Sequence, residues 1–366
     1  MPRARAMFSR LKPLITRHPT TTHSRCMAKE ETLPFYKPDQ FYPVHTGELL
    51  HATYQVIGKL GYGAYSTVWL CHDQRNRIHV AAKVLTAAFS GQKSREVEVY
   101  QHLSRLGRSH VGSASIRGLY DMFDISGPDG LHRCLVQMSM HALRMRAGSG
   151  KLNIKASNIM LSIDDETILS NFERTEAEHP SPRKTVDANR TIYVSRKLPS
   201  PKRDRWGQPV LCDLGEARIG KLHRGDIQPN IYKAPEVLFD MPWSFSADIW
   251  IVGVMIWDIF ENKHLFNALD EDRDYSPSHH VAEMVAYLGV PPLHFLQRSE
   301  ETRNVFDEKG QWLGAGGVSV PSISLEESEE NLEGPNKQLF LQFLRSMLRW
   351  VPEERKLQRN YWTTLG

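Results

Sequence analysis

A tight turn with two glycines, Gly61 and Gly63, constrains this chain most, because it joins two predicted strands instead of opening a helix. One strand is predicted at 54–60 and the next begins in the alternating run 67–71. Without a Cβ, backbone N–H groups can approach phosphate oxygens closely. A dinucleotide-binding fold needs a helix directly after its glycines, so this context argues against one. Any tight β-turn also favours glycine, and the turn alone leaves both interpretations open.

Lys83 ends the run Val-Ala-Ala-Lys inside the apolar segment 78–85, which predicts a further strand of a hairpin. A lysine flanked by apolar residues on a strand places its ammonium inside a fold, where it needs an anion. Residues 91–106 have the pattern of an amphipathic helix and carry Glu96, which has the right charge for a partner. Phosphates would be the other partner. The alternative is an edge lysine whose head reaches water.

Two later segments carry oxygen ligands. Asp213 follows an apolar run and precedes Gly215, a placement suited to holding a divalent cation from a turn. Asn158 could supply a neutral oxygen to the same ion. Further downstream come Ala-Pro-Glu ending at Glu236, Asp248 in Asp-Ile-Trp, and a late Pro-Glu-Glu-Arg ending at Arg355. Each of these also has a purely structural interpretation.

The first part of the chain predicts strands and the second part predicts helices. Further strands are predicted at 118–125 and 132–138, and helices at 247–260, 280–288 and 338–350. Residues 171–205 are rich in Pro, Ser, Arg and Lys and predict an exposed basic insertion. The expected division is a basic, disordered leader at 1–34, a small lobe at 35–138 and a large lobe at 139–366 that carries the insertion.

The net charge of +4 is unevenly distributed. Residues 1–29 hold seven Lys or Arg and no acid, which leaves 39 basic against 42 acidic residues for the rest. A nucleic-acid-binding domain normally shows its basic excess in the folded part, so none is expected here. The longest strongly apolar stretch, 249–260, is too short to span a bilayer. The four cysteines lie far apart, which argues against a disulfide scaffold or structural zinc site.

Taken in chain order, these motifs resemble the eukaryotic protein kinase domain. Within that superfamily the chain looks most like the kinases of serine/arginine-rich splicing factors (SRPK-like), particularly their fungal members. The stretches that carry this resemblance are 42–50, 59–70, 210–218 and 226–236. It covers roughly 35–366 and implies an α+β, two-lobed kinase-like fold, with a small β-rich N-lobe containing one helix and a larger, mainly helical C-lobe.

The resemblance also implies roles for individual residues. Those expected to cover or hold ATP are Leu60, Gly61, Tyr62, Gly63, Val68, Ala81, Lys83 and Glu96. Those expected to hold Mg²⁺ are Asn158 and Asp213, and those expected to be structural are Glu236, Asp248 and Arg355. Glu236 and Arg355 would form a buried ion pair. Lys155 matches the lysine that marks serine/threonine specificity in this superfamily.

Two departures from the family pattern bear on activity. Asn153 stands where the family has its catalytic aspartate, and Lys151 where it has a histidine. An amide cannot act as a base near pH 7. In addition, only fourteen residues separate Met138 from Asn153, too few for the two helices of ordinary length expected there. The kinase fold is therefore expected to be shortened between hinge and catalytic loop, which should leave apolar surface on the 249–260 helix uncovered.

The expected function is an ATP-dependent serine/threonine kinase that phosphorylates serine in Arg/Ser-rich protein segments, using ATP and Mg²⁺ and acting as a monomer. Because of Asn153, one alternative is a pseudokinase that binds nucleotide or serves as a scaffold. Because of the short segment before Asn153, another alternative is the product of a mis-spliced gene model. From Asp213 to Glu236 there is no Ser or Thr, so a constitutively ordered activation segment is predicted. The expected location is cytoplasmic or nuclear, or mitochondrial if the leader is a presequence.

Overall fold

The computed structural model describes residues 29–33, 36–87, 94–106, 111–142, 158–201, 205 and 207–356. The chain forms two compact units. The first, the small unit, combines Met1–Ala142 with Met160–Gly215, and the second, the helical unit, combines Leu143–Ile159 with Glu216–Gly366. This division differs from the lobe boundary expected after Met138, because the segment from 160 to 215 groups with the sheet.

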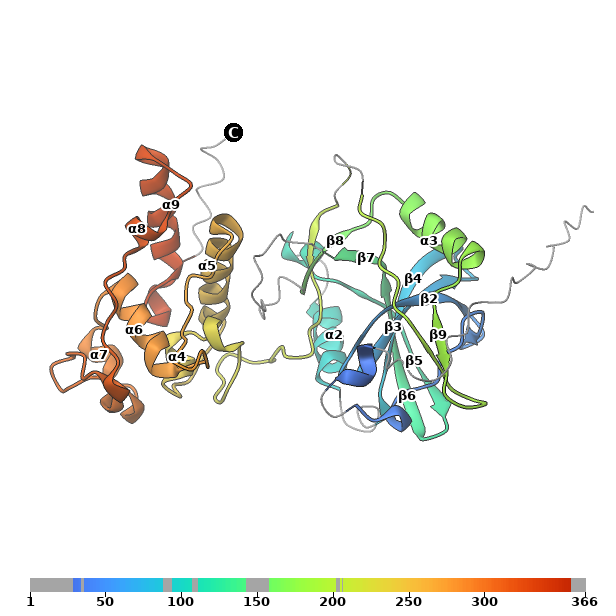
Figure 1. The fold of residues 1–366 in the computed structure, drawn as a ribbon, viewed down its shortest axis with the longest axis horizontal. Coiled ribbons are helices and arrows are strands. Elements are labelled where there is room, and N and C mark those ends of the chain that lie inside the picture. Colours follow the sequence, from blue (N-terminus) through green and yellow to red (C-terminus); the bar gives the residue numbers. More distant parts are fainter. Residues whose placement is uncertain are drawn as a thin grey trace, which may run out of the picture. The chain divides into compact units, whose positions relative to one another are not determined.

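The small unit is built on a six-stranded antiparallel sheet in the order β1-β2-β3-β4-β6-β5 (Figure 1). Its strands are β1 (Leu49–Leu50), β2 (Tyr54–Gly63), β3 (Ser66–Asp73), β4 (Ile78–Leu85), β5 (Leu119–Gly127) and β6 (Gly130–Met138). Helix α2 (Arg95–Leu106) follows β4. These elements lie where the sequence predicts them, because period-two and amphipathic patterns are local signals. A second sheet orders β11 (Pro209–Leu211), β8 (Ile159–Ser162) and β7 (Met140–Ala142).

Alternation along the strands gives the main sheet two different faces. One, the Trp69 face, carries the larger core, which includes Trp69, Val80, Ala82 and Val136. The other, the Lys83 face, carries Val68 opposite Lys83 and Leu70 opposite Ala81 on the paired strands β3 and β4. The residues expected to meet a nucleotide therefore share one face.

The insertion predicted at 171–205 is exposed for most of its described length, but it also folds onto the small unit. Helix α3 (Thr167–Glu178) and the hairpin of β9 (Arg183–Thr185) and β10 (Thr191–Tyr193) belong to the small unit. Phe172 is 1% exposed and packs against Leu70, and Tyr193 is 5% exposed and meets Trp69 edge to face. The many Pro, Ser, Arg and Lys residues hide these few large apolar side chains in the sequence, yet the apolar residues decide the packing.

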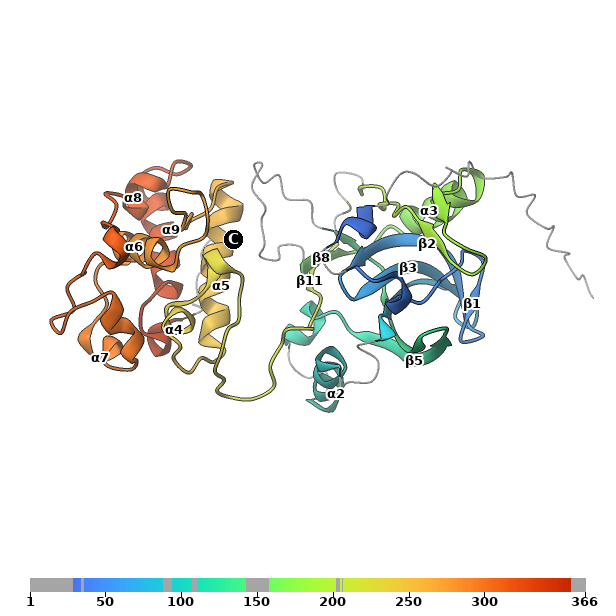
Figure 2. The ribbon, with the colours of Figure 1, turned by 60° about the horizontal axis from the view of Figure 1, so that its bottom comes forward.

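The helical unit contains one large core. Its helices are α4 (Pro235–Leu238), α5 (Ser246–Glu261), α6 (Pro277–Leu288), α7 (Leu293–Leu296), α8 (Leu325–Ser328) and α9 (Gly334–Met347). Helix α5 buries Trp250, Val254 and Trp257, and α9 lies beside it (Figures 1 and 2). At Gly253 a Cβ would meet Leu348 at 3.0 Å, so glycine permits the close approach of the chain that follows α9.

Part of α5 remains uncovered. Ile259 is 48% exposed and Phe260 is 39% exposed, although the Phe260 ring contacts that of Phe340 of α9 with 4.5 Å between the ring centroids. The segment before Asn153 is too short for two helices, and for that reason apolar surface on α5 is expected to be uncovered. Among the helices in the described part of the chain, none combines the length and the apolar character needed to cross a bilayer.

Candidate active site

The glycine turn between β2 and β3 is open to its surroundings. After a register shift between Lys59 and Gly61, Gly61 pairs with Val68 and Gly63 pairs with Ser66 next to the turn. A Cβ added at Gly61 would meet no atom within 4 Å. Steric crowding within the chain therefore does not require glycine at 61. Glycine there suits the irregular pairing between Lys59 and Gly61 and would also let a ligand approach the backbone closely.

Lys83 on β4 is held by Glu96 of α2. Its Nζ donates to Glu96 Oε2 at 2.7 Å, and the side chains are 20% and 6% exposed. Glu96 Oε1 is buried and has no hydrogen-bond partner among the described residues. An ammonium has three N–H donors, and Glu96 accepts only one of them here. The others can donate to further anions.

Asp213, near the C-terminal end of the small unit, also contacts the Lys83 ammonium. Its Oδ1 lies 3.6 Å from Lys83 Nζ, and its side chain is 47% exposed. The residue adopts a left-handed backbone conformation, with φ of 57°, which non-glycine residues adopt rarely and mostly at functional or turn positions. The two groups expected on opposite sides of a triphosphate and its metal are thus neighbours.

The remaining residues expected around the nucleotide lie on the Lys83 face or beside it. Ala81 is 3% exposed, and Val68 and Leu60 are partly buried. Leu60 packs in a small apolar cluster with Leu70, Leu169 and Phe172. The side chain of Tyr62 instead faces Lys59, whose Nζ lies 5.6 Å from the ring centroid.

The side chains around Lys83 are better suited to binding Mg²⁺ together with ATP than to holding a metal ion by themselves. In the described part of the chain, no group of three or more His, Cys, Asp or Glu side chains could hold a metal ion. Magnesium is typically held by one or two carboxylates together with substrate phosphates. A half-exposed Asp213, an ammonium with spare donors and an open glycine turn would supply what such a complex needs.

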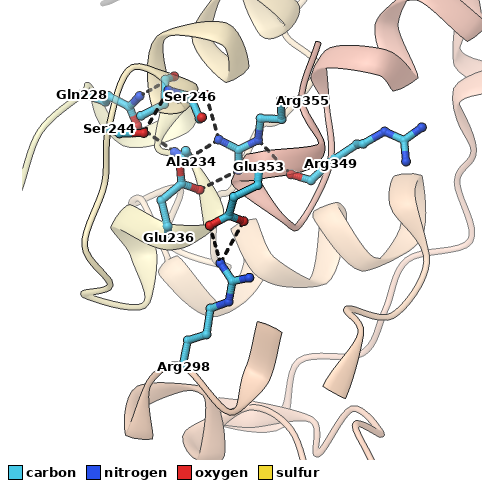
Figure 3. Close-up of polar contacts among 10 residues, drawn as sticks. Gln228, Ala234, Glu236, Ser244, Ser246, Arg298, Arg349, Glu353 and Arg355 are labelled. Carbon is cyan, nitrogen blue, oxygen red and sulfur yellow. Dashed lines mark hydrogen bonds and ion pairs between the residues drawn. The ribbon is translucent and has the colours of Figure 1, made fainter. Parts of the chain in front are cut away.

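In the helical unit, Glu236 and Arg355 form a buried ion pair (Figure 3). The Arg355 guanidinium donates to both Glu236 oxygens at 2.7 and 2.6 Å, and the two side chains are 0% and 1% exposed. Its remaining donors reach the carbonyls of Ser246 and Arg349, each at 2.9 Å. Each of the three guanidinium nitrogens therefore has at least one acceptor in a place where an unpaired charge would be costly.

Comparison with known proteins gives a consistent result. A serine/threonine protein kinase of Aspergillus fumigatus is 40% identical over 377 residues, which cover 95% of this chain and 94% of that protein. The chain belongs to the serine/threonine protein kinase family. A Physarum polycephalum serine/threonine-protein kinase named SRPK is 22% identical over 383 residues, covering 91% of this chain and 90% of that protein.

The fold of this kinase agrees with that assignment. The crystal structure of a kinase domain matches it with a TM-score of 0.61 at 19% identity, covering 87% of this chain and 96% of that one. The predicted α+β kinase fold, with a β-rich part and a helical part, is confirmed. No protein-family model matches the chain.

Several expected site residues of the kinase are not placed by the structure. Asn153, Lys155 and Lys151 lie outside the described residues. Asn158 directly precedes β8 and is partly buried, and its role toward Asp213 remains a prediction. Asp248 lies in the first turn of α5 with an exposed side chain.

The segment from Asp213 to Glu236, which is expected to be the activation segment, contains a buried tyrosine. Tyr232 is 1% exposed, and its hydroxyl donates to Asp258 of α5. Asp258 also accepts from the backbone N–H of Leu265 at 3.1 Å and contacts His264 Nδ1 at 2.8 Å. This network was not found in the sequence, because its members are polar residues separated by irregular spacings.

A second buried lysine of the kinase was also missed. Lys59 of β2 is 2% exposed and forms an ion pair with Glu30, while Glu31 of the same short helical turn pairs with Lys184 at 3.0 Å. Burial lowers the pKa of Lys59, and Glu30 opposes that effect. The reasoning applied to Lys83 applies equally to Lys59 and would have found it.

Proposed function

We propose that this kinase transfers the γ-phosphoryl group of Mg-ATP to serine in Arg/Ser-rich protein segments. The observation that carries the proposal is the position of Lys83 Nζ, 2.7 Å from Glu96 and 3.6 Å from Asp213. A cation that contacts two carboxylates, on a strand paired with the one that follows the glycine turn, suits the binding of phosphates and their metal ion.

In the proposed reaction, the serine oxygen forms a bond to the γ-phosphorus while the bond between that phosphorus and ADP breaks. Lys83 would bind the phosphates from the sheet, and Asp213 would hold the magnesium ion that neutralises their charge. The hydroxyl proton then passes to a phosphoryl oxygen or to water. Asn153 cannot accept it near neutral pH, so we expect a rate about 10²–10⁴ lower than an aspartate would give.

The substrate class is supported by the resemblance of the chain to the SRPK-like kinases. The relative named SRPK matches over nearly its whole length. A basic peptide would also be attracted to acidic surface, and α8 and the chain after it carry five glutamates, namely Glu326, Glu327, Glu329, Glu330 and Glu333. Four of these glutamates are exposed or partly exposed, whereas Glu329 is buried.

The direct test is phosphate transfer from Mg-ATP to an Arg-Ser repeat peptide, with an Arg-Ala peptide as the blank. Lys83→Met should abolish transfer, because Lys83 is the only side chain of the sheet among the described residues that is expected to bind the phosphates. Lys263→Met is the matched control, since it removes an exposed lysine paired with Glu330 in the helical unit. Equal transfer by both variants would reject the proposal.

Asn153 favours a second candidate, a pseudokinase that binds nucleotide without transferring phosphate. Binding of ATP by the wild-type chain, with no transfer to any Arg-Ser peptide, would select this candidate. Failure of ATP to raise the midpoint of thermal unfolding would exclude the nucleotide-binding form of both candidates.

A further inference from the structure

Strand β2, which leads into the glycine turn, is paired over only part of its length on the side that faces β1. β1 pairs with β2 only at Tyr54 and Gln55, and backbone bonds to residues 47 and 48 extend that pairing to Val56. Beyond Val56, the backbone N–H of Arg196 donates to the carbonyl of Lys59 at 2.8 Å. The insertion thus pairs with β2 two residues before Gly61.

The insertion also packs on the Lys83 face. Leu169 and Phe172 of α3 contact Leu70, which lies directly opposite Ala81 on the neighbouring strand. Ile163, which precedes α3, and Leu198, near the end of the insertion, are partly buried in the same cluster as Leu60. Side chains of α3 and of the insertion therefore border the Lys83 face, where the adenine of ATP is expected to bind.

The fit between α3 and β2 is close. A Cβ at Gly58 would lie 3.1 Å from the Phe172 ring and 3.2 Å from Glu176. Glu176 in turn accepts from Ser181 at 2.8 Å and from Arg196 Nε at 2.6 Å. This buried carboxylate ties the end of α3 to the same Arg196 whose backbone pairs with Lys59.

We propose that Leu198 and the cluster around it position Leu60 and the glycine strand for nucleotide binding, so that the insertion sets nucleotide affinity and release. The proposal rests on the proposed function, because it assumes that ATP and ADP bind at the Lys83 face. Leu198 is a positioning residue in this scheme, since it acts through Leu60.

The physical reason is preorganisation. A strand whose outer side is unpaired can move, and ordering it on binding costs conformational entropy. Packing Leu60 against Leu198 and pairing Lys59 with Arg196 reduce that motion before the nucleotide arrives. Loss of the Leu198 side chain should therefore weaken nucleotide binding and speed nucleotide release.

The experiment measures binding of N-methylanthraniloyl-ADP with Mg²⁺ to the full chain, by fluorescence titration and by stopped-flow displacement with ADP. Leu198→Ala should weaken binding by about three- to tenfold, mainly through faster dissociation. Ile125→Ala is the matched control, because Ile125 is a partly buried aliphatic residue packed on the opposite, Trp69 face. Leu198→Met, which restores an apolar side chain of similar volume, should recover most of the affinity.

The outcomes separate this proposal from the proposed function. Wild-type protein that does not bind the fluorescent ADP would overturn the nucleotide site itself. Wild-type protein that binds, with Leu198→Ala and Ile125→Ala giving the same affinity and dissociation rate at equal thermal stability, would overturn only the positioning role. Weakening by Leu198→Ala with recovery by Leu198→Met would support it.

Discussion

Arg355 holds Glu236 with two hydrogen bonds across 119 residues of chain, and the pair is sealed from water. Removing one member leaves the other charge buried without its partner. Arg355→Leu should therefore lower the free energy of unfolding by about 3–5 kcal/mol. Urea unfolding followed by tryptophan fluorescence measures this, since Trp250 lies beneath the guanidinium at 5.1 Å.

The control for this pair lies close by. Arg349→Leu removes an exposed partner of Glu354, at 3.4 Å, and should change stability by less than about 1 kcal/mol. If both substitutions had equally small effects, the buried pair would not anchor the helical unit.

Glu30 is expected to be a required part of the folded kinase, because it neutralises Lys59 next to the glycine turn. Glu30→Gln should lower the free energy of unfolding at pH 7 by about 3 kcal/mol, since an uncompensated ammonium then stays buried. Glu31→Gln, which affects the less buried Lys184, should cost less. Equal losses for both variants would contradict this assignment.

The pH dependence of that loss follows from the lowered pKa of Lys59. A lysine whose folded-state pKa is lowered costs stability while it is protonated, and that cost disappears as the pH rises through the folded-state pKa toward 10.5. Glu30→Gln lowers this pKa further. The difference between variant and wild type should therefore shrink as the solution becomes alkaline, and a constant difference would show that charge is not the cause.

Tyr232 should not serve as a phosphorylation switch, because its hydroxyl is buried against Asp258. Tyr232→Phe should cost about 1 kcal/mol at pH 7 through the lost hydrogen bond. Burial and Asp258 raise the pKa of Tyr232, so the folded state loses stability above about pH 10, where the unfolded state ionises. The variant should lose less in that range, whereas Tyr65→Phe, at a ring that is 57% exposed, should behave as wild type.

Restoring the carboxylate at position 153 should increase phosphate transfer. Asn153→Asp is expected to raise kcat by about 10²–10⁴, because it supplies a general base. The KM for ATP should change little, since the phosphates are bound elsewhere. Asn189→Asp adds the same charge at an exposed position of the small unit and should have no effect. An unchanged kcat in Asn153→Asp would mean that the base is not what limits this chain.

Local patterns in the sequence predicted the strands β2 to β6, helix α2 and helix α5 well, because alternation and amphipathic spacing depend on neighbouring residues. The pairs Lys83–Glu96 and Glu236–Arg355 followed from the order of motifs, which the kinase resemblance supplied. The structure shows both pairs within hydrogen-bonding distance.

The packing of the insertion could not be predicted in the same way. Its composition predicted solvent exposure, which holds for most of its described residues, but its packing depends on two aromatic residues, Phe172 and Tyr193, that bury against opposite faces of the sheet. The spacing of Ile168, Leu169 and Phe172 was a usable signal of an amphipathic helix. Which surface that helix covers depends on Gly58, a contact made across more than a hundred residues.

The bond from Arg196 to Lys59 also bears on how this protein behaves at high concentration. An unpaired strand border recruits strands from other molecules, which leads to aggregation. The chain occupies part of the border of β2 with its own backbone, two residues before the glycine turn. A shortened version lacking residues 163–198 would leave the border open, and copies of it would be expected to associate through β2.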